Sequence, residues 1–84
     1  MSARIRVLVV DDTALYRKIL SEAVAQVPDA ELDGAAASGA LALKRLGQGD
    51  VDLVLLYVVM PYMDGVQTFS QFWRDWPHVS VALV

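Results

Sequence analysis

Two adjacent carboxylates, Asp11 and Asp12, follow an apolar run near the start of the chain, and Asp64 lies in a later loop. Adjacent carboxylates repel each other, and the arrangement suits a hard cation such as Mg²⁺, which prefers oxygen ligands. In a second interpretation, Asp12 or Thr13 only caps the helix that follows, since Asp and Thr are preferred N-cap residues, and Asp11 is solvated. The residue types alone leave both interpretations open.

The elements that must position these residues follow from the pattern of apolar side chains. Ile5 to Val10 is a β-branched, almost unbroken apolar run, which is typical of a strand buried on both faces of a parallel sheet. Two further apolar runs and one weaker stretch of small residues alternate with helical patterns that end at proline or glycine. The expected strands are 5–10, 31–37, 53–57 and 79–84; the expected helices are 15–27, one from Ser38 or Gly39 to Leu46, and 66–76.

The first of these helices has a simple expected orientation. Its apolar residues repeat at a spacing of four, which predicts that they face the core while the charged residues, Arg17 among them, face outward. The expected core line is Leu15, Ile19, Ala23 and Val27, with Tyr16, Leu20 and Val24 beside it.

Strands that alternate with helices predict an α/β fold: a parallel sheet with helices on both faces, in the order β-α-β-α-β-α-β. Ligands of such sheets bind at the carboxyl ends of the strands. Asp11 and Asp12 stand at the carboxyl end of the first strand, and the third strand ends at Tyr57. The sequence therefore predicts that these three residues meet at one edge of the sheet.

Composition excludes several classes of protein. The 84 residues include no cysteine, so a disulfide scaffold and a cysteine zinc site are excluded. A net charge of −3 argues against a nucleic-acid binder, which needs a basic face. The longest uncharged apolar run, Leu53 to Met63, contains Pro61 and is shorter than the ~18 residues of a membrane span. We expect one small cytoplasmic domain that binds neither nucleic acid nor membrane.

Two motifs carry a family resemblance. Residues 7–17, VLVVDDTALYR, and residues 60–65, MPYMDG, resemble response-regulator receiver domains, in particular those of the chemotaxis protein-glutamate methylesterases. The resemblance implies a flavodoxin-like (CheY-like) fold, with sheet order 2-1-3-4 for the strands present here. It also implies a role in two-component signalling, with a sensor histidine kinase or chemotaxis proteins as partners. In this family Mg²⁺ is held by the acidic pair, here Asp11 and Asp12, by the phosphoacceptor Asp and by a backbone carbonyl, here that of Val59.

The chain departs from the family pattern in two respects. Tyr57 occupies the position that matches the phosphoacceptor Asp, and a phenol cannot form an acyl phosphate. The family's switch Ser/Thr and active-site Lys follow later strands, so the match assigns neither of them here. We therefore expect 1–84 to be a partial receiver-like domain that lacks the last helix-strand-helix. Its expected function is that of a binding module or pseudo-receiver, without enzymatic activity, with weak Mg²⁺ binding and impaired phosphorylation.

Two alternatives come from other classes. A haloacid-dehalogenase-type phosphatase also places acids after its first strand, but it needs Asp-x-Asp, whereas Asp11 and Asp12 are adjacent and Thr13 follows. The chain would otherwise be a structural remnant without a ligand. Among the remaining residues, His78 is expected in a loop, and Trp73 and Trp76 are expected in the core or an interface.

The last expected strand carries a prediction about assembly. Five of the six residues in 79–84 are apolar, and the family's strand order places this strand at the edge of the sheet. An uncovered apolar edge presents free backbone groups to other chains. We expect a homodimer that pairs through Val79–Val84.

Overall fold

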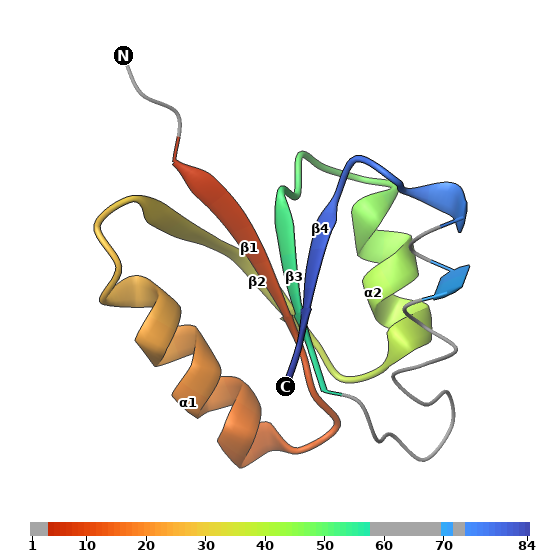
Figure 1. The fold of residues 1–84 in the computed structure, drawn as a ribbon. Helices are drawn as coiled ribbons and strands as arrows, with labels where there is room; N and C mark the ends of the chain where they lie inside the picture. Colours follow the sequence, from red (N-terminus) through yellow and green to blue (C-terminus); the bar gives the residue numbers. More distant parts are fainter. Residues whose placement is uncertain (1–3, 58–69, 72–73) are drawn as a thin grey trace.

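The computed structural model describes residues 4–57, 70–71 and 74–84, and its centre is a four-stranded parallel sheet (Figure 1). The strands lie in the order β2-β1-β3-β4, as expected from the sequence. All three pairings are parallel, with Val10 opposite Ala36 on one side and Leu56 on the other. The bounds are β1, Ile5–Val10; β2, Ala30–Ala36; β3, Leu53–Leu56; and β4, Ser80–Leu83.

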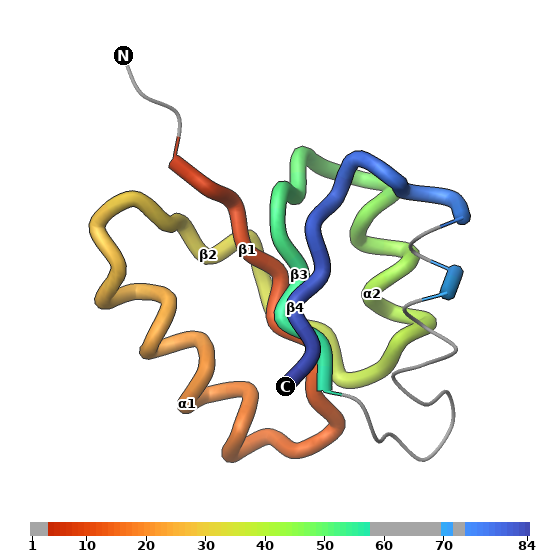
Figure 2. The backbone as a smooth tube through the Cα atoms, in the orientation of Figure 1, coloured from red at the N-terminus to blue at the C-terminus, as the bar shows by residue number. Residues whose placement is uncertain are grey.

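Two helices cover the two faces of the sheet, α1 (Ala14–Ala25) on one side and α2 (Gly39–Leu46) on the other, and the backbone tube shows this separation clearly (Figure 2). The strand β1 supplies both cores. Val7 and Val9 pack with Val24 of α1, whereas Leu8 and Val10 join the larger cluster on the α2 side. A strand buried on both faces is what the unbroken apolar run predicts.

The element bounds agree with the sequence to within about one residue at most ends. The strand β2 begins and ends one residue earlier than expected, and β3 ends at Leu56, just before Tyr57. The expected helix 66–76 falls mostly outside the described residues. Within this range, the described residues 70, 71, 74 and 75 are helical. Neither α1 nor α2 is long and apolar enough to span a membrane.

The ends of α2 follow the sequence signals. The Ser38 hydroxyl accepts a hydrogen bond from the Leu41 N–H at 3.2 Å, which makes Ser38 a true N-cap. Gly47 is the C-cap residue, as the glycine stop signal indicates, and its N–H bonds the carbonyl of Leu43. Lys44 and Arg45 lie in the last turn, where the helix dipole favours positive charge.

The orientation of α1 differs from the expected one. Leu15 and Ile19, on the expected core line, are 61% and 48% exposed, whereas Val24 is buried and Leu20 packs against the same cluster. The two apolar lines of this helix are adjacent, and the one through Leu20 and Val24 faces the sheet. The spacing of four residues was correct, but it could not tell which of two neighbouring lines the sheet would cover.

One buried carboxylate ties three elements together. The register of β2 against β1 shifts beside Val7 and Leu8, and Asp33 is the extra residue of this β-bulge. Its side chain, 1% exposed, accepts hydrogen bonds from Arg6 of β1 and Arg45 of α2, both at 2.8 Å. Arg45 also donates to the Asp33 carbonyl at 3.2 Å. The bulge thus directs a carboxylate into a two-arginine clamp.

The clamp sets the ionisation of Asp33. Burial alone would raise the pKa of this carboxyl, but the hydrogen bonds from Arg45 and Arg6 outweigh burial and lower the pKa below its usual 3.8. A lowered pKa means that folding favours the ionised form. The resulting stabilisation is fully present above the unfolded-state pKa, and it is lost as the pH falls through the lower pKa of the folded state.

We therefore expect Asp33→Asn to lower the free energy of unfolding by about 1–3 kcal/mol at neutral pH, because it leaves Arg45 without its anion and leaves Arg6 paired only with the exposed Glu31. The difference from the natural chain should begin to shrink as the pH falls below about 3.8, where the carboxyl of the unfolded chain takes up a proton, and it should be lost as the pH falls through the lower pKa of the folded state. Urea unfolding across this pH range measures both effects. Asp29→Asn, at an exposed residue, is the control; an Asp33→Asn variant no less stable than this control would contradict the prediction.

Candidate functional site

The first acid of the pair is built into the sheet. Asp11 directly follows β1, and its N–H donates to the Ala36 carbonyl at 3.1 Å, which continues the pairing with β2 by one residue. The residue as a whole, backbone and side chain together, is only 2% exposed. Asp12, by contrast, is exposed. Adjacent in sequence, the two carboxylates lie in different environments.

The geometry tests the capping interpretation of the acidic pair. Thr13 occupies the N-cap position of α1, but its side chain makes no capping bond. Instead, the Thr13 N–H donates to Asp11 Oδ1 at 2.9 Å, and the Thr13 hydroxyl approaches Asp12 Oδ1 at 3.4 Å. The interpretation in which Asp12 or Thr13 caps the helix while Asp11 is solvated is therefore wrong. Asp11 is buried and bonded, and the turn after β1 closes on its carboxylate.

Arg17, in the first turn of α1, contacts the end of β1, and the sequence pattern did not predict this contact. Its Nη1 donates to the Asp11 carbonyl at 2.8 Å, so the first turn of α1 is tied back to the end of β1. The helical pattern had placed Arg17 on the outer face. The signal available in the sequence was its distance of six residues from Asp11, which a long side chain in the first helical turn can span.

Tyr57 comes next to Asp11 through the pairing of β3 with β1. Its N–H donates to the Val10 carbonyl at 2.9 Å, one residue before Asp11. The side chain is half-buried and packs against the larger core cluster. Asp11 and Tyr57 line one pocket of about 280 Å³, together with Tyr16, Ile19, Leu20 and Val84. The expected meeting of the first and third strand ends is confirmed for these two residues.

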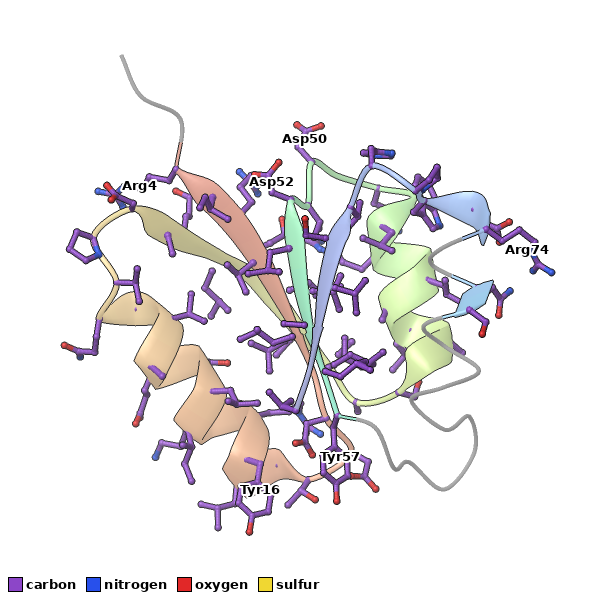
Figure 3. The ribbon with its side chains drawn as sticks, viewed as in Figure 1. Arg4, Tyr16, Asp50, Asp52, Tyr57 and Arg74 are labelled. Carbon is purple, nitrogen blue, oxygen red and sulfur yellow. The ribbon has the colours of Figure 1, made fainter. Side chains whose placement is uncertain are left out.

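The pocket lies at the carboxyl ends of the strands. Tyr16 and Tyr57 stand at this end of the sheet, whereas Asp50 and Asp52 stand at the opposite end (Figure 3). Trp76 lines a separate pocket with Asp50, Asp52 and His78, so it belongs to that opposite end. Its ring packs against the core and meets the His78 ring edge-on, with centroids 6.3 Å apart. The core role expected of Trp76 is confirmed, and Trp73 lies outside the described residues.

The donor set offers oxygen ligands, but few of them. Of the two Asp11 carboxylate oxygens, Oδ1 accepts the Thr13 N–H, and Oδ2 has no hydrogen-bond partner among the described residues. Asp12 supplies an exposed second carboxylate. No group of three acidic or other metal-ligating residues forms among the residues 4–57, 70–71 and 74–84. Val59, whose backbone carbonyl is the third expected ligand, lies outside the described residues, as does Asp64 of the later loop. The two carboxylates are thus ligands of the type that Mg²⁺ prefers, but two carboxylates fill only part of its coordination shell.

Comparison with known proteins agrees with this geometry. Residues 7–84 match the family described as the response regulator receiver domain. A protein-glutamate methylesterase/protein-glutamine glutaminase of Desulfotalea psychrophila is 44% identical over 80 residues, which are 95% of this chain and 22% of that protein. The corresponding protein of Geobacillus kaustophilus is 41% identical, over 95% of this chain and 23% of its own length. The chain spans about a fifth of the length of these relatives.

Solved structures show the same fold. The response regulator domain of Thermotoga maritima CheB superposes with a TM-score of 0.88 at 29% identity, over 95% of this chain and 59% of that one. The Salmonella typhimurium RcsB response regulator superposes with a TM-score of 0.89 over 98% of this chain and 42% of its own. Its identity is only 18%, so it is evidence for the fold alone.

Proposed function

The chain belongs to the response regulator receiver domain family, and from this premise we propose that it is a chemotaxis-type receiver module impaired in phosphorylation. The observation that carries the proposal is the phenol of Tyr57 beside Asp11, at the end of β3. The likeness to methylesterase receivers supports the chemotaxis assignment. Family membership also favours this function over the phosphatase alternative, whose Asp-x-Asp motif the chain lacks.

The chemistry of Tyr57 supports impaired phosphorylation. In the family, the phosphoryl group forms a mixed anhydride with a carboxylate at this position, and a phenol offers only an aryl ester. The ring also occupies the space next to Asp11, where it packs against the core. Tyr57 therefore removes an acceptor and a cation ligand together, while its backbone N–H keeps the bond to Val10.

Family membership also supports a proposal about the chain's role, its location in the cell and its partners. We infer that residues 1–84 act as one cytoplasmic receiver-like unit, a binding module without catalysis of its own, for a sensor histidine kinase or chemotaxis proteins. The methylesterase activity named for the relatives extends over proteins that this chain matches for about a fifth of their length. The receiver part alone is the basis of the proposal.

We expect acetyl phosphate with Mg²⁺ to leave the chain unphosphorylated, because Tyr57 offers no carboxylate. Intact-mass spectra recorded before and after mild base treatment measure this, with a receiver that carries Asp at the acceptor position treated in parallel as the reagent control. A base-labile phosphoryl adduct would contradict the prediction. A base-stable adduct mapped to Tyr57 would contradict it equally, since the phenol itself would then be the acceptor.

Mg²⁺ binding should be weak, with a dissociation constant of about 1 mM or higher, because two carboxylates leave most coordination sites to water. Asp11 and Asp12 would hold the cation, with the Val59 carbonyl as a third ligand. Calorimetry and the backbone amide signal of Thr13 are the suitable readouts, since Trp76 lies at the other end of the sheet.

Asp12→Asn is the sharpest variant for this test, because Asp12 is exposed and its replacement spares the buried turn. It should weaken the Thr13 response to Mg²⁺ severalfold, whereas Asp29→Asn, a matched change at an exposed residue, should not. Sub-micromolar binding would show that other ligands complete the site. Unchanged binding in an Asp11→Ala/Asp12→Ala double variant would show that the cation lies elsewhere.

We further propose that the chain forms a homodimer through Val79–Val84. The support is the position of β4, the outermost of the four described strands on its side and paired with β3 alone among them. Leu83 and Val84 are 47% and 52% exposed, so apolar surface accompanies the open edge. Pairing of two such edges across a twofold axis gives a closed assembly.

Leu83→Lys should convert the dimer to monomer, because two lysines would then meet across the axis. Leu83 is a better position than Val81, which packs against the core and whose replacement by Lys would disturb folding. Light scattering coupled to size exclusion measures the mass, and Leu15→Lys on α1 is the control at a more exposed residue. A monomeric natural chain at micromolar concentration would disprove the dimer, and a dimer that survives Leu83→Lys would place its interface elsewhere.

A further inference from the structure

The sheet has a second edge, β2, and its last residues are unusually small. In the described part of the chain, β2 pairs with β1 alone. After the bulge at Asp33 the strand continues through Gly34 and Ala35 and ends at Ala36, and Ala37 follows it. Glycine within a strand often marks a place where another backbone approaches closely. The Ala36 carbonyl is bonded to the Asp11 N–H, but no side chain in this stretch is larger than a methyl group, so little shields the outer side of the backbone here.

A groove of about 570 Å³ runs beside this edge, between β2 and α2. The last residues of β2, from Asp33 to Ala36, form one side of it together with Ala37. The residues 41, 44, 45 and 48, which share one face of a helix and its C-terminal extension, form the other. Gly34 leaves the groove open: a Cβ at this position would meet nothing nearer than Arg45 Nε at 3.8 Å.

The groove is positively charged in a chain whose net charge is negative. Arg17, Lys44 and Arg45 line it, and Asp33 is the single acidic residue among the lining residues. Arg45 is already paired with Asp33, and Nη1 of Arg17 is bonded to the Asp11 carbonyl. Lys44 is exposed and forms no ion pair within the described residues. Its ammonium and the remaining N–H groups of Arg17 are therefore available to an anion.

The bulge distinguishes this edge from an ordinary one. The Asp33 carbonyl accepts a hydrogen bond from Arg45, so it is not free to pair with an added strand. Beyond it, Gly34 to Ala37 form a short edge next to the groove, with the cations at its margin. Backbone pairing with such an edge provides affinity, and alternate side chains of the added strand point into the neighbouring groove and provide specificity.

We propose that this groove binds an extended acidic segment of a partner protein, which adds as a strand beside Gly34–Ala37 and directs its carboxylates toward Lys44 and Arg17. The site is separate from the Asp11–Tyr57 pocket, and it does not depend on phosphorylation or on the β4 dimer. Charge complementarity selects the occupant, because three cations line a groove with one carboxylate.

The direct test is binding of a labelled peptide of alternating Glu and Val, as long as β2, to the full 84-residue chain. Fluorescence anisotropy should show saturable binding that weakens as salt is added, and the same peptide with Lys in place of Glu should not bind. Backbone amide signals of Gly34 to Ala37 should shift on titration. No binding of the acidic peptide, or equal binding of the basic one, would overturn the proposal.

Matched charge reversals locate the site. Lys44→Glu should weaken peptide binding about three- to tenfold, whereas Lys18→Glu, the same change on α1 outside the groove, should leave it nearly unaltered. Equal effects of the two variants, or amide shifts confined to β4 or to the Asp11–Tyr57 pocket, would place the peptide elsewhere. The amide shifts of the natural chain remain decisive even where a variant is poorly folded. Binding of inorganic pyrophosphate in place of the peptide would make the groove a simple anion site and would also overturn the proposal.

Discussion

The rest of the domain depends on the double pairing of the central strand β1. Residues 7–10 of this strand pair with β2 on one side and with β3 on the other. Leu8, Val9 and Val10 are at most 1% exposed, and each face of the strand contributes to a different core. Because Val10 is held from both sides, the residue that follows it has little freedom. This constraint places Asp11 at the carboxyl end of the strand, whatever its own side chain contacts.

The same constraint fixes the position of Tyr57 independently of its side chain. Tyr57 keeps its place because its backbone N–H bonds to Val10, and that bond is indifferent to the side chain. The ring then packs against a cluster formed by the strands and α2. Backbone pairing sets the position and the side chain sets the chemistry, so one can change without the other. A receiver fold is therefore good evidence for ancestry and weaker evidence for phosphorylation.

Much of the fold could be predicted because its signals are local. The unbroken run in β1 indicated burial on both faces, and Ser38 and Gly47 marked the ends of α2. The orientation of α1 was missed because two apolar lines run side by side on that helix. The Asp33 clamp was missed because Arg6 and Arg45 lie 27 and 12 residues away, and only the bulge brings the carboxylate to them. Periodicity carries no information about such contacts.

Arg17 shows how the candidate site and the groove are related. Its side chain bonds the carbonyl of Asp11, and it also lines the groove between β2 and α2. The residue belongs to α1, which packs on the other face of the sheet, so its side chain reaches past the carboxyl ends of the strands to the α2 side. Any anion held there would lie close to the backbone that positions Asp11. Arg17 therefore connects the groove to the Asp11–Tyr57 pocket: it lines the groove, and its hydrogen bond of 2.8 Å holds the backbone of a residue that lines the pocket.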